Sequence, residues 1–122
     1  MIQNPSKIYE VIDVITQRFR KDRKDNNYYG LLQDGLALLE EVPNLINLSS
    51  EQETEYRKLE ARLLDEEKDG KRNTSSYCEA QAKASDFYRE YRRAENFKEL
   101  CYDMVNMSKK LAGDVNKSFN TQ

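Results

Sequence analysis

Residues 76–112 read SYCEAQAKASDFYREYRRAENFKELCYDMVNMSKKLA, contain no proline or glycine, and decide the fold. Apolar residues recur there every three or four positions, which predicts one long amphipathic helix. The first run consists of Tyr77, Ala80, Ala84, Phe87, Tyr91 and Ala94. A second run, shifted in phase, consists of Phe97, Leu100, Met104, Met107 and Leu111. A helix of about 36 residues is about 54 Å long, more than a domain of this size needs, so its apolar face must meet other helices of this chain or of further copies.

The composition fits helices with solvated outer faces. The chain has 122 residues, of which 34% are charged and 38% apolar, with a net charge of −2. This length predicts one domain, spanning 1–122, and the charge content is typical of oligomeric helical proteins. No apolar run is long enough to cross a membrane, and no signal-peptide pattern opens the chain. We therefore expect a cytoplasmic protein without membrane partners, in which Cys78 and Cys101 are reduced thiols about 35 Å apart on one helix.

The N-terminal part predicts two helices within 1–48. Asn4 as N-cap and Pro5 at the first helical position open a helix, which the polar run 25–27 ends. Its apolar stripe is Ile8, Val11, Ile12, Ile15 and Phe19. A second helix is predicted from Tyr28 to Val42, because Pro43 pushes the residue before it out of the helical region.

The remainder predicts a helical hairpin over 49–115. Ser50 and Glu53 form a capping-box pattern that opens a third helix, which should stop near 69–70, where a glycine suits a C-terminal cap. Ser76 and Glu79 repeat the capping-box pattern and open the long helix, and Gly113 should close it before a tail over 116–122. The predicted fold is all-α: a long-helix antiparallel hairpin with two N-terminal helices, in an oligomer.

Residue types that support catalysis are scarce. The chain has no histidine, which excludes Ser/His and Cys/His catalytic pairs and zinc sites with histidine ligands, and its two separated cysteines do not make a zinc site. No glycine-rich phosphate loop is present, and the acidic residues between 51 and 69 lack the EF-hand pattern. We therefore expect no catalytic residues, no metal and no cofactor.

Two basic clusters are the candidate binding residues. The first comprises Arg18, Arg20, Lys21, Arg23 and Lys24, and the second comprises Arg89, Arg92 and Arg93 beside Tyr88 and Tyr91. Aromatic rings next to arginines can stack bases and neutralise phosphates of a single strand. The tyrosine pair 28–29 follows the first cluster and is the pair least explained by packing. The alternative is that these charges only solvate helix faces and pair with acids along the helices.

Residues 80–95, AQAKASDFYREYRRAE, follow a predicted helix and a glycine-containing turn. Over about residues 55–114 this arrangement resembles UvsY-type recombination mediators of bacteriophages, in which a long helix carries alternating charged and aromatic residues. The resemblance implies a ring-like oligomer that binds single-stranded DNA and helps load a recombinase in place of a single-strand-binding protein. It would place the protein in the cytoplasm of a phage-infected host.

The leading hypothesis is thus a non-enzymatic accessory protein for DNA recombination or replication, acting through protein contacts and weak single-stranded DNA binding. An alternative is an inhibitor or adaptor that binds one host protein, such as a nuclease or polymerase, without touching DNA. A third is a purely structural part of a helical assembly. Because the third helix can cover only about half of the fourth, the second apolar run must be covered by the first two helices or by another chain. We expect self-association through this run, which consists of Phe97, Leu100, Met104, Met107 and Leu111.

Overall fold

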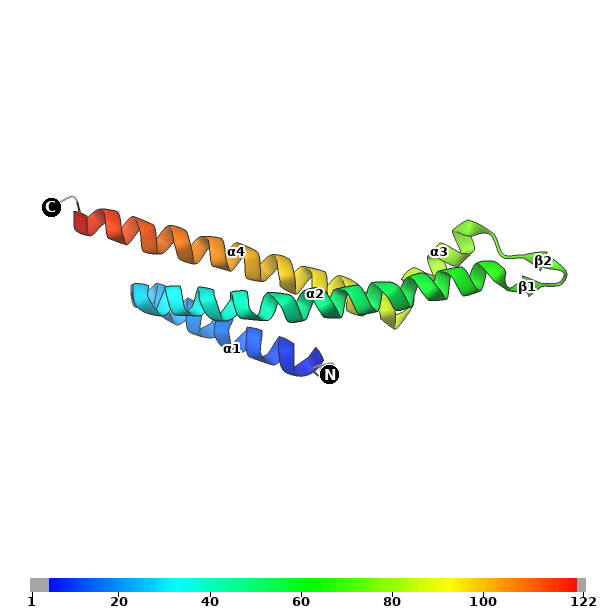
Figure 1. The fold of residues 1–122 in the computed structure, drawn as a ribbon, viewed down its shortest axis with the longest axis horizontal. Coiled ribbons are helices and arrows are strands. Elements are labelled where there is room, and N and C mark those ends of the chain that lie inside the picture. The colour runs from blue at the N-terminus through cyan, green and yellow to red at the C-terminus, as the bar shows by residue number, and fades with distance from the viewer. Residues whose placement is uncertain (1–4, 121–122) are drawn as a thin grey trace. The chain divides into compact units, whose positions relative to one another are not determined.

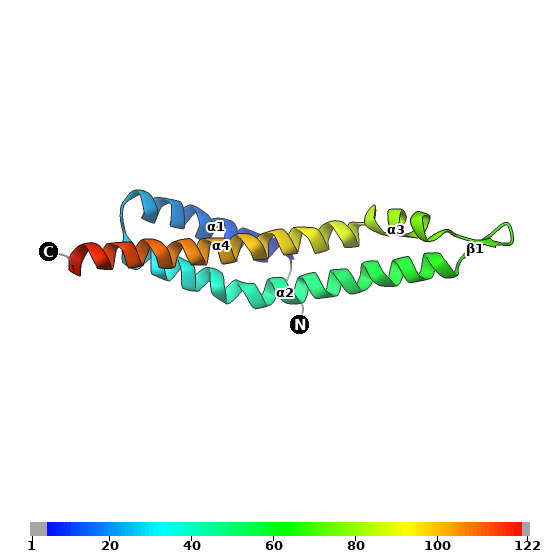
Figure 2. The same cartoon turned by 90° about the horizontal axis from the view of Figure 1, so that it is seen from above.

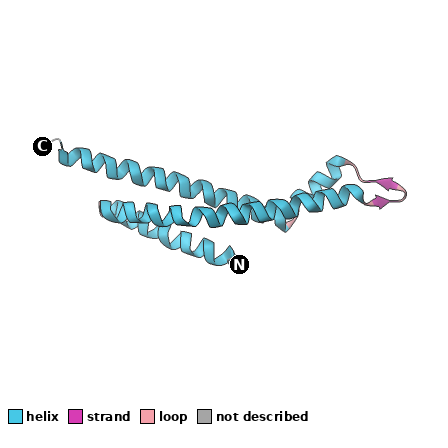
Figure 3. Ribbon diagram, in the orientation of Figure 1, coloured by secondary structure: helices cyan, strands magenta, loops and turns pink. Residues whose placement is uncertain are grey.

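The computed structural model describes the backbone of residues 5–120, and side chains over the same range except at 68, 112 and 114–120. Four helices make up nearly all of it: α1 (Pro5–Lys24), α2 (Tyr28–Asp65), α3 (Ser75–Lys83) and α4 (Asp86–Asn120) (Figure 1). Two short strands, β1 (Glu67–Lys68) and β2 (Lys71–Arg72), form a hairpin between α2 and α3 (Figure 3). The prediction of an all-α protein is confirmed.

The chain divides into two compact units, residues 1–45 with 97–122, and residues 46–96. Each unit contains a part of α2 and a part of α4, which are the two longest helices (Figure 2). The predicted boundary between residues 48 and 49 falls inside α2.

In the first unit, α1 and the first part of α2 run antiparallel, because Arg18 contacts Asp34 across the turn at residues 25–27. The last part of α4 also packs here. The Tyr9 ring lies 4.5 Å from the Phe97 ring, and the Ser108 hydroxyl donates a hydrogen bond of 2.6 Å to the Leu31 carbonyl. The core of this unit is the predicted stripe of α1 packed against both other helices; it includes Ile8, Ile12, Ile15, Phe19, Leu31, Leu38, Val42, Leu45 and Cys101.

In the second unit, the last part of α2 runs antiparallel to α3 and the first part of α4, as the hairpin prediction requires. The Tyr56 ring lies 5.1 Å from Tyr88 and 6.1 Å from Tyr91, and the Ser49 hydroxyl donates to a Glu95 carboxylate oxygen. Tyr56 is buried and the rings of the other two tyrosines, which are half-buried, pack around it.

The prediction that Pro43 ends a helix was wrong, because α2 continues through it to Asp65. A proline inside a helix costs about 3 kcal/mol. Leu38, Val42 and Leu45 lie on one face around it and are all buried, at roughly 1.5–3 kcal/mol each. Pro43 itself is exposed, so water can reach the carbonyl that lost its partner. Burial of the stripe outweighs the proline, and the separate third helix that was predicted to begin at Ser50 does not exist.

The prediction of one uninterrupted helix over 76–112 was also wrong. The chain breaks at Ala84 and Ser85, where the Ser85 hydroxyl donates to the Ala82 carbonyl at 2.6 Å and accepts from the Tyr88 amide at 3.4 Å. One serine thus caps the end of α3 and the start of α4 without any glycine or proline. Thr74, not Ser76, is the N-cap of α3.

Two further boundaries differ from the predictions. Asp69 and Gly70 have positive φ of 56° and 77° and form the two-residue turn of the β-hairpin, so Gly70 is not a helix cap. Gly113 does not end the last helix, which extends to Asn120, so the predicted tail is largely helical. The predicted N-cap Asn4 lies outside the described residues.

Candidate functional site

The first basic cluster lies in the C-terminal half of α1, and all five of its side chains are exposed. Lys21, Arg23 and Lys24 are in the last turn, where cations interact favourably with the helix dipole. Two members are engaged inside the chain. Arg18 Nε is 2.8 Å from Asp34 Oδ1, and Arg23 Nη1 is 3.6 Å from the Met107 sulfur.

The second basic cluster, Arg89, Arg92 and Arg93, is exposed on α4 and belongs to the other unit. Arg89 forms an ion pair with Asp86 one turn earlier. Both clusters are therefore exposed, each within its own unit.

The second apolar run of α4 is covered partly from within the chain. Met104 is buried, with its sulfur 3.8 Å from the Thr16 hydroxyl of α1, and Phe97 packs on Tyr9. Leu111 is half-buried, whereas Leu100 and Met107 are exposed. Of the two possibilities that the sequence left open for this run, cover by the N-terminal helices or by another chain, α1 provides the first for Met104 and Phe97; self-association stays a prediction.

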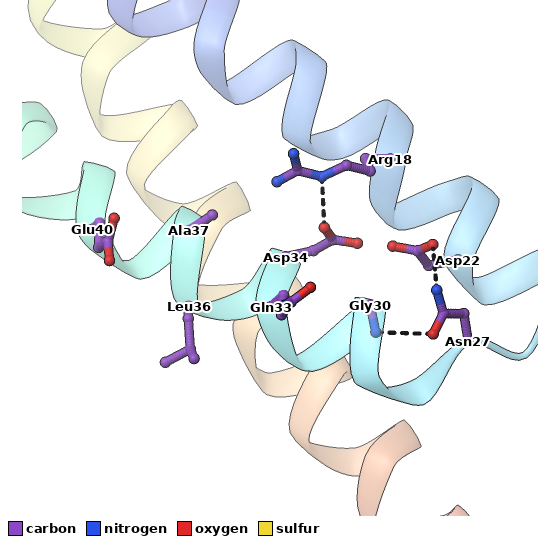
Figure 4. Close-up of a pocket in the computed structure, with 9 residues that line it drawn as sticks. All are labelled: Arg18, Asp22, Asn27, Gly30, Gln33, Asp34, Leu36, Ala37 and Glu40. Atoms are coloured by element: carbon purple, nitrogen blue, oxygen red, sulfur yellow. Dashed lines mark hydrogen bonds and ion pairs between the residues drawn. The ribbon is translucent and has the colours of Figure 1, made fainter.

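A polar pocket of about 550 Å³ lies beside the turn between α1 and α2 (Figure 4). Its lining residues are Arg18, Asp22, Asn27, Gly30, Gln33, Asp34, Leu36, Ala37 and Glu40.

The Asn27 side chain organises one end of this pocket. Its Oδ1 accepts from the Gly30 amide at 3.1 Å, and its Nδ2 donates to Asp22 Oδ1 at 3.2 Å. Gly30 is required for this close approach, since a Cβ there would lie 2.6 Å from Asn27 Nδ2 and 2.7 Å from Asp22 Cγ. A glycine that weakens α2 as an isolated helix therefore allows the turn and the pocket to form.

Asp34 is the buried acid of the pocket, with 1% of its surface exposed. Its Oδ1 accepts from Arg18, while its Oδ2 has no hydrogen-bond donor among the described residues and faces the Asp22 carboxyl group (Figure 4). Burial, and then the Asp22 carboxyl group, raise the pKa of Asp34 to about 6, against the opposing effect of Arg18. A proton on Asp34 would supply the hydrogen bond between the two carboxyl groups, which neither can donate when both are ionised.

An exposed apolar stripe runs along α2 on a different face from the core residues. It consists of Tyr29, Leu32, Leu36 and Leu39, and Pro43 continues the same spacing. We call these five residues the α2 stripe. Tyr29 is 73% exposed and Leu36 62%. The alternation of three- and four-residue steps is the seam pattern of helices that pack on a partner helix.

Both thiols are buried and free, as expected for small apolar side chains. The prediction that they share one helix was wrong, because Cys78 lies on α3 and Cys101 on α4. Burial raises the pKa of Cys78, and it raises that of Cys101 to about 11. Both are therefore protonated at neutral pH and unsuited to nucleophilic attack. Within the described part of the chain, no three His, Cys, Asp or Glu side chains are grouped to hold a metal ion, and no helix is long and apolar enough to cross a membrane.

Sequence reasoning missed the pocket acids and the α2 stripe as functional candidates. The signal for Asp34 was present, because it lies on the same helical face as the buried Leu31 and Leu38. The signal for the stripe was the regular spacing of its leucines on a second face of α2.

Comparisons with protein-family models, curated proteins and solved structures found no match to the chain.

Proposed function

We propose that this protein is a non-enzymatic adaptor that binds an amphipathic helix of another protein along the α2 stripe. The observation that carries the proposal is the exposure of four large apolar side chains at helix-packing spacing: Tyr29, Leu32, Leu36 and Leu39. From Tyr29 to Pro43 the stripe is about 21 Å long, which matches roughly four turns of a partner helix.

The size of the stripe favours one docked helix over a stable dimer of this chain. Its four large side chains expose on the order of 400 Å² of apolar surface, within the range of functional patches on monomers. A standard protein–protein interface buries about 800 Å² on each partner. An amphipathic helix lying along such a stripe would anchor on the same three- and four-residue steps.

The test is a selection of helical peptides from a displayed random library against the full-length chain. The selected peptides should carry leucine-like residues at three- and four-residue spacing. They should bind Leu36→Glu at least about tenfold more weakly, because a charge would be desolvated at the centre of the contact. Val14→Glu is the matched control, since Val14 is a 60% exposed residue of α1 outside the stripe, and it should bind as the wild type does.

The proposal fails if the selection yields no helical peptide, or if the selected peptides bind Leu36→Glu unchanged. A dimer in light scattering that Leu36→Glu dissociates would show instead that a second copy of this chain occupies the stripe.

Single-stranded DNA binding is a second candidate function, and one observation favours it. Three exposed cations of α1, Arg20, Lys21 and Lys24, precede the exposed Tyr29 across a three-residue turn. Cations next to an accessible ring can hold a phosphate backbone and stack a base. A recombination-accessory role of the kind that UvsY-type mediators have would depend on this site.

A further inference from the structure

The polar pocket adjoins the α2 stripe, because Leu36 belongs to both. The charges that face the pocket are unbalanced. Asp22 from α1 and Asp34 and Glu40 from α2 are acidic, and Arg18 from α1 is the one basic residue among the lining side chains. An apolar contact surface thus borders a cavity with an excess of carboxylates.

Within this pocket one buried oxygen, Oδ2 of Asp34, lacks a hydrogen-bond donor among the side chains that the structure describes. Arg18 Nε donates to Oδ1 of the same carboxylate, and Asn27 Nδ2 donates to Asp22. A buried carboxylate oxygen without a donor is costly, and two facing carboxylates repel each other. A cationic donor that contacts both Asp22 and Asp34 from the pocket would offset both effects.

We propose that the pocket receives the ammonium or guanidinium group of a lysine or arginine side chain carried by the helix that docks on the α2 stripe. The inference rests on the proposed docking function and specifies the chemistry of the partner: an amphipathic helix with one basic residue flanking its apolar seam. The cavity of about 550 Å³ has room for such a side chain.

A divalent metal ion fits this pocket less well than an organic cation. The described residues contain no group of three acidic, cysteine or histidine ligands, and the Arg18 guanidinium group already lies 2.8 Å from Asp34. The Asn27 carbonyl oxygen, which could have been a further ligand, accepts from the Gly30 amide. Lysine and arginine side chains carry a single positive charge and directional N–H donors, and a donor is what Oδ2 of Asp34 lacks.

The first test uses n-butylguanidinium as a probe of the full-length protein at neutral pH, followed by NMR. The probe should cause saturable shifts of the Asp34 carboxyl carbon and the Gly30 amide, and it should lower the pKa of Asp34, which is about 6 without it. Asp34→Asn should weaken probe binding at least about tenfold, the effect of losing a charge-assisted hydrogen bond. Asp13→Asn, which removes an exposed acid of α1 outside the pocket, is the matched control and should leave probe binding unchanged.

The neutral analogue n-butylurea should not reproduce these shifts. Equal shifts with n-butylurea, binding unchanged in Asp34→Asn, or no saturable shift with n-butylguanidinium would each overturn the pocket proposal.

The second test uses the helical peptides selected against the α2 stripe. Their enriched sequences should contain a lysine or arginine beside the apolar seam. Replacing it by norleucine should weaken binding to the wild type about tenfold and leave binding to Asp34→Asn unchanged. If the peptides depend on Leu36 but tolerate norleucine, the pocket proposal fails and the docking function stands. If no peptide depends on Leu36, the docking function fails, and the probe titration alone decides whether the pocket binds a cation.

Discussion

Replacing Asp34 by Asn should stabilise the protein at neutral pH, although it removes one partner of an ion pair. Burial and the Asp22 carboxyl group raise the pKa of Asp34 from 3.8 to about 6, and Arg18 only partly opposes them. Raising the pKa of Asp34 from 3.8 to about 6 corresponds to roughly 3 kcal/mol. This is the cost of ionising Asp34 in the folded state relative to the unfolded state.

The sign of the pH dependence follows from the raised pKa. Protonated Asp34 favours the folded state, so its contribution is complete below about pH 4 and is lost as the pH rises through about 6. At pH 7 the wild type should therefore be up to about 3 kcal/mol less stable than Asp34→Asn, which stays neutral and can still donate to Asp22. The two proteins should converge in stability as the pH approaches 4.

Urea unfolding between pH 4 and pH 7.5 measures this difference. With a slope of about 1.5 kcal/mol/M, 3 kcal/mol is a midpoint difference of about 2 M at pH 7. Asp13→Asn, at an exposed position of α1, should change stability by less than about 0.5 kcal/mol. Asp22→Asn should lower the pKa of Asp34 in an NMR titration, because Asp22 is one cause of its elevation. If Asp34→Asn is less stable than the wild type at pH 7 and keeps the same pH profile, the argument from desolvation is refuted.

Three other predictions concern the core and the basic residues. Met104→Glu should destabilise the fold by roughly 3–5 kcal/mol, because it places an unpaired charge where Met104 is buried against α1. If the variant is as stable as the wild type and only its oligomeric mass in light scattering differs, Met104 faces another chain instead. Cys101→Ala should cost about 1 kcal/mol in urea unfolding and leave partner binding intact, whereas a folded variant that no longer binds would indicate a functional thiol. Fluorescence anisotropy with labelled single-stranded DNA should detect salt-dependent binding by the wild type. Replacing Arg20, Lys21 and Arg23 by alanine should reduce the slope of log affinity against log salt concentration by about two, at roughly 0.7 per phosphate contact. Wild-type protein that shows no binding at low salt excludes the DNA function.

The spacing of apolar residues alone was enough to predict helices that bury one face. The stripe of α1, from Ile8 to Phe19, and its end before residue 25 were predicted, and so was the antiparallel return of the chain in the second unit. These features depend on spacing of three and four residues and on short turns, which can be recognised without knowing what packs on the helix.

The candidate site could be predicted only in part. Exposure of both basic clusters agrees with their charge, but Arg18 is bound by an acid sixteen positions away on another helix. Asp34 draws its raised pKa from burial and from Asp22, which are properties of the folded arrangement. A residue's neighbours across a turn, and the water it loses, are not visible in the order of residues.

By itself, the sequence determined that the chain is helical, which residues form the apolar stripe of α1, and that the two thiols are small buried groups. Only the tertiary structure decided that α2 passes through Pro43 and that α1 covers Met104. The physical reason is that a proline inside a helix, or an apolar stripe left exposed, costs only a few kcal/mol of folding free energy. Packing of Leu38, Val42 and Leu45 against other helices is worth more than one proline, and it is settled only when those helices meet.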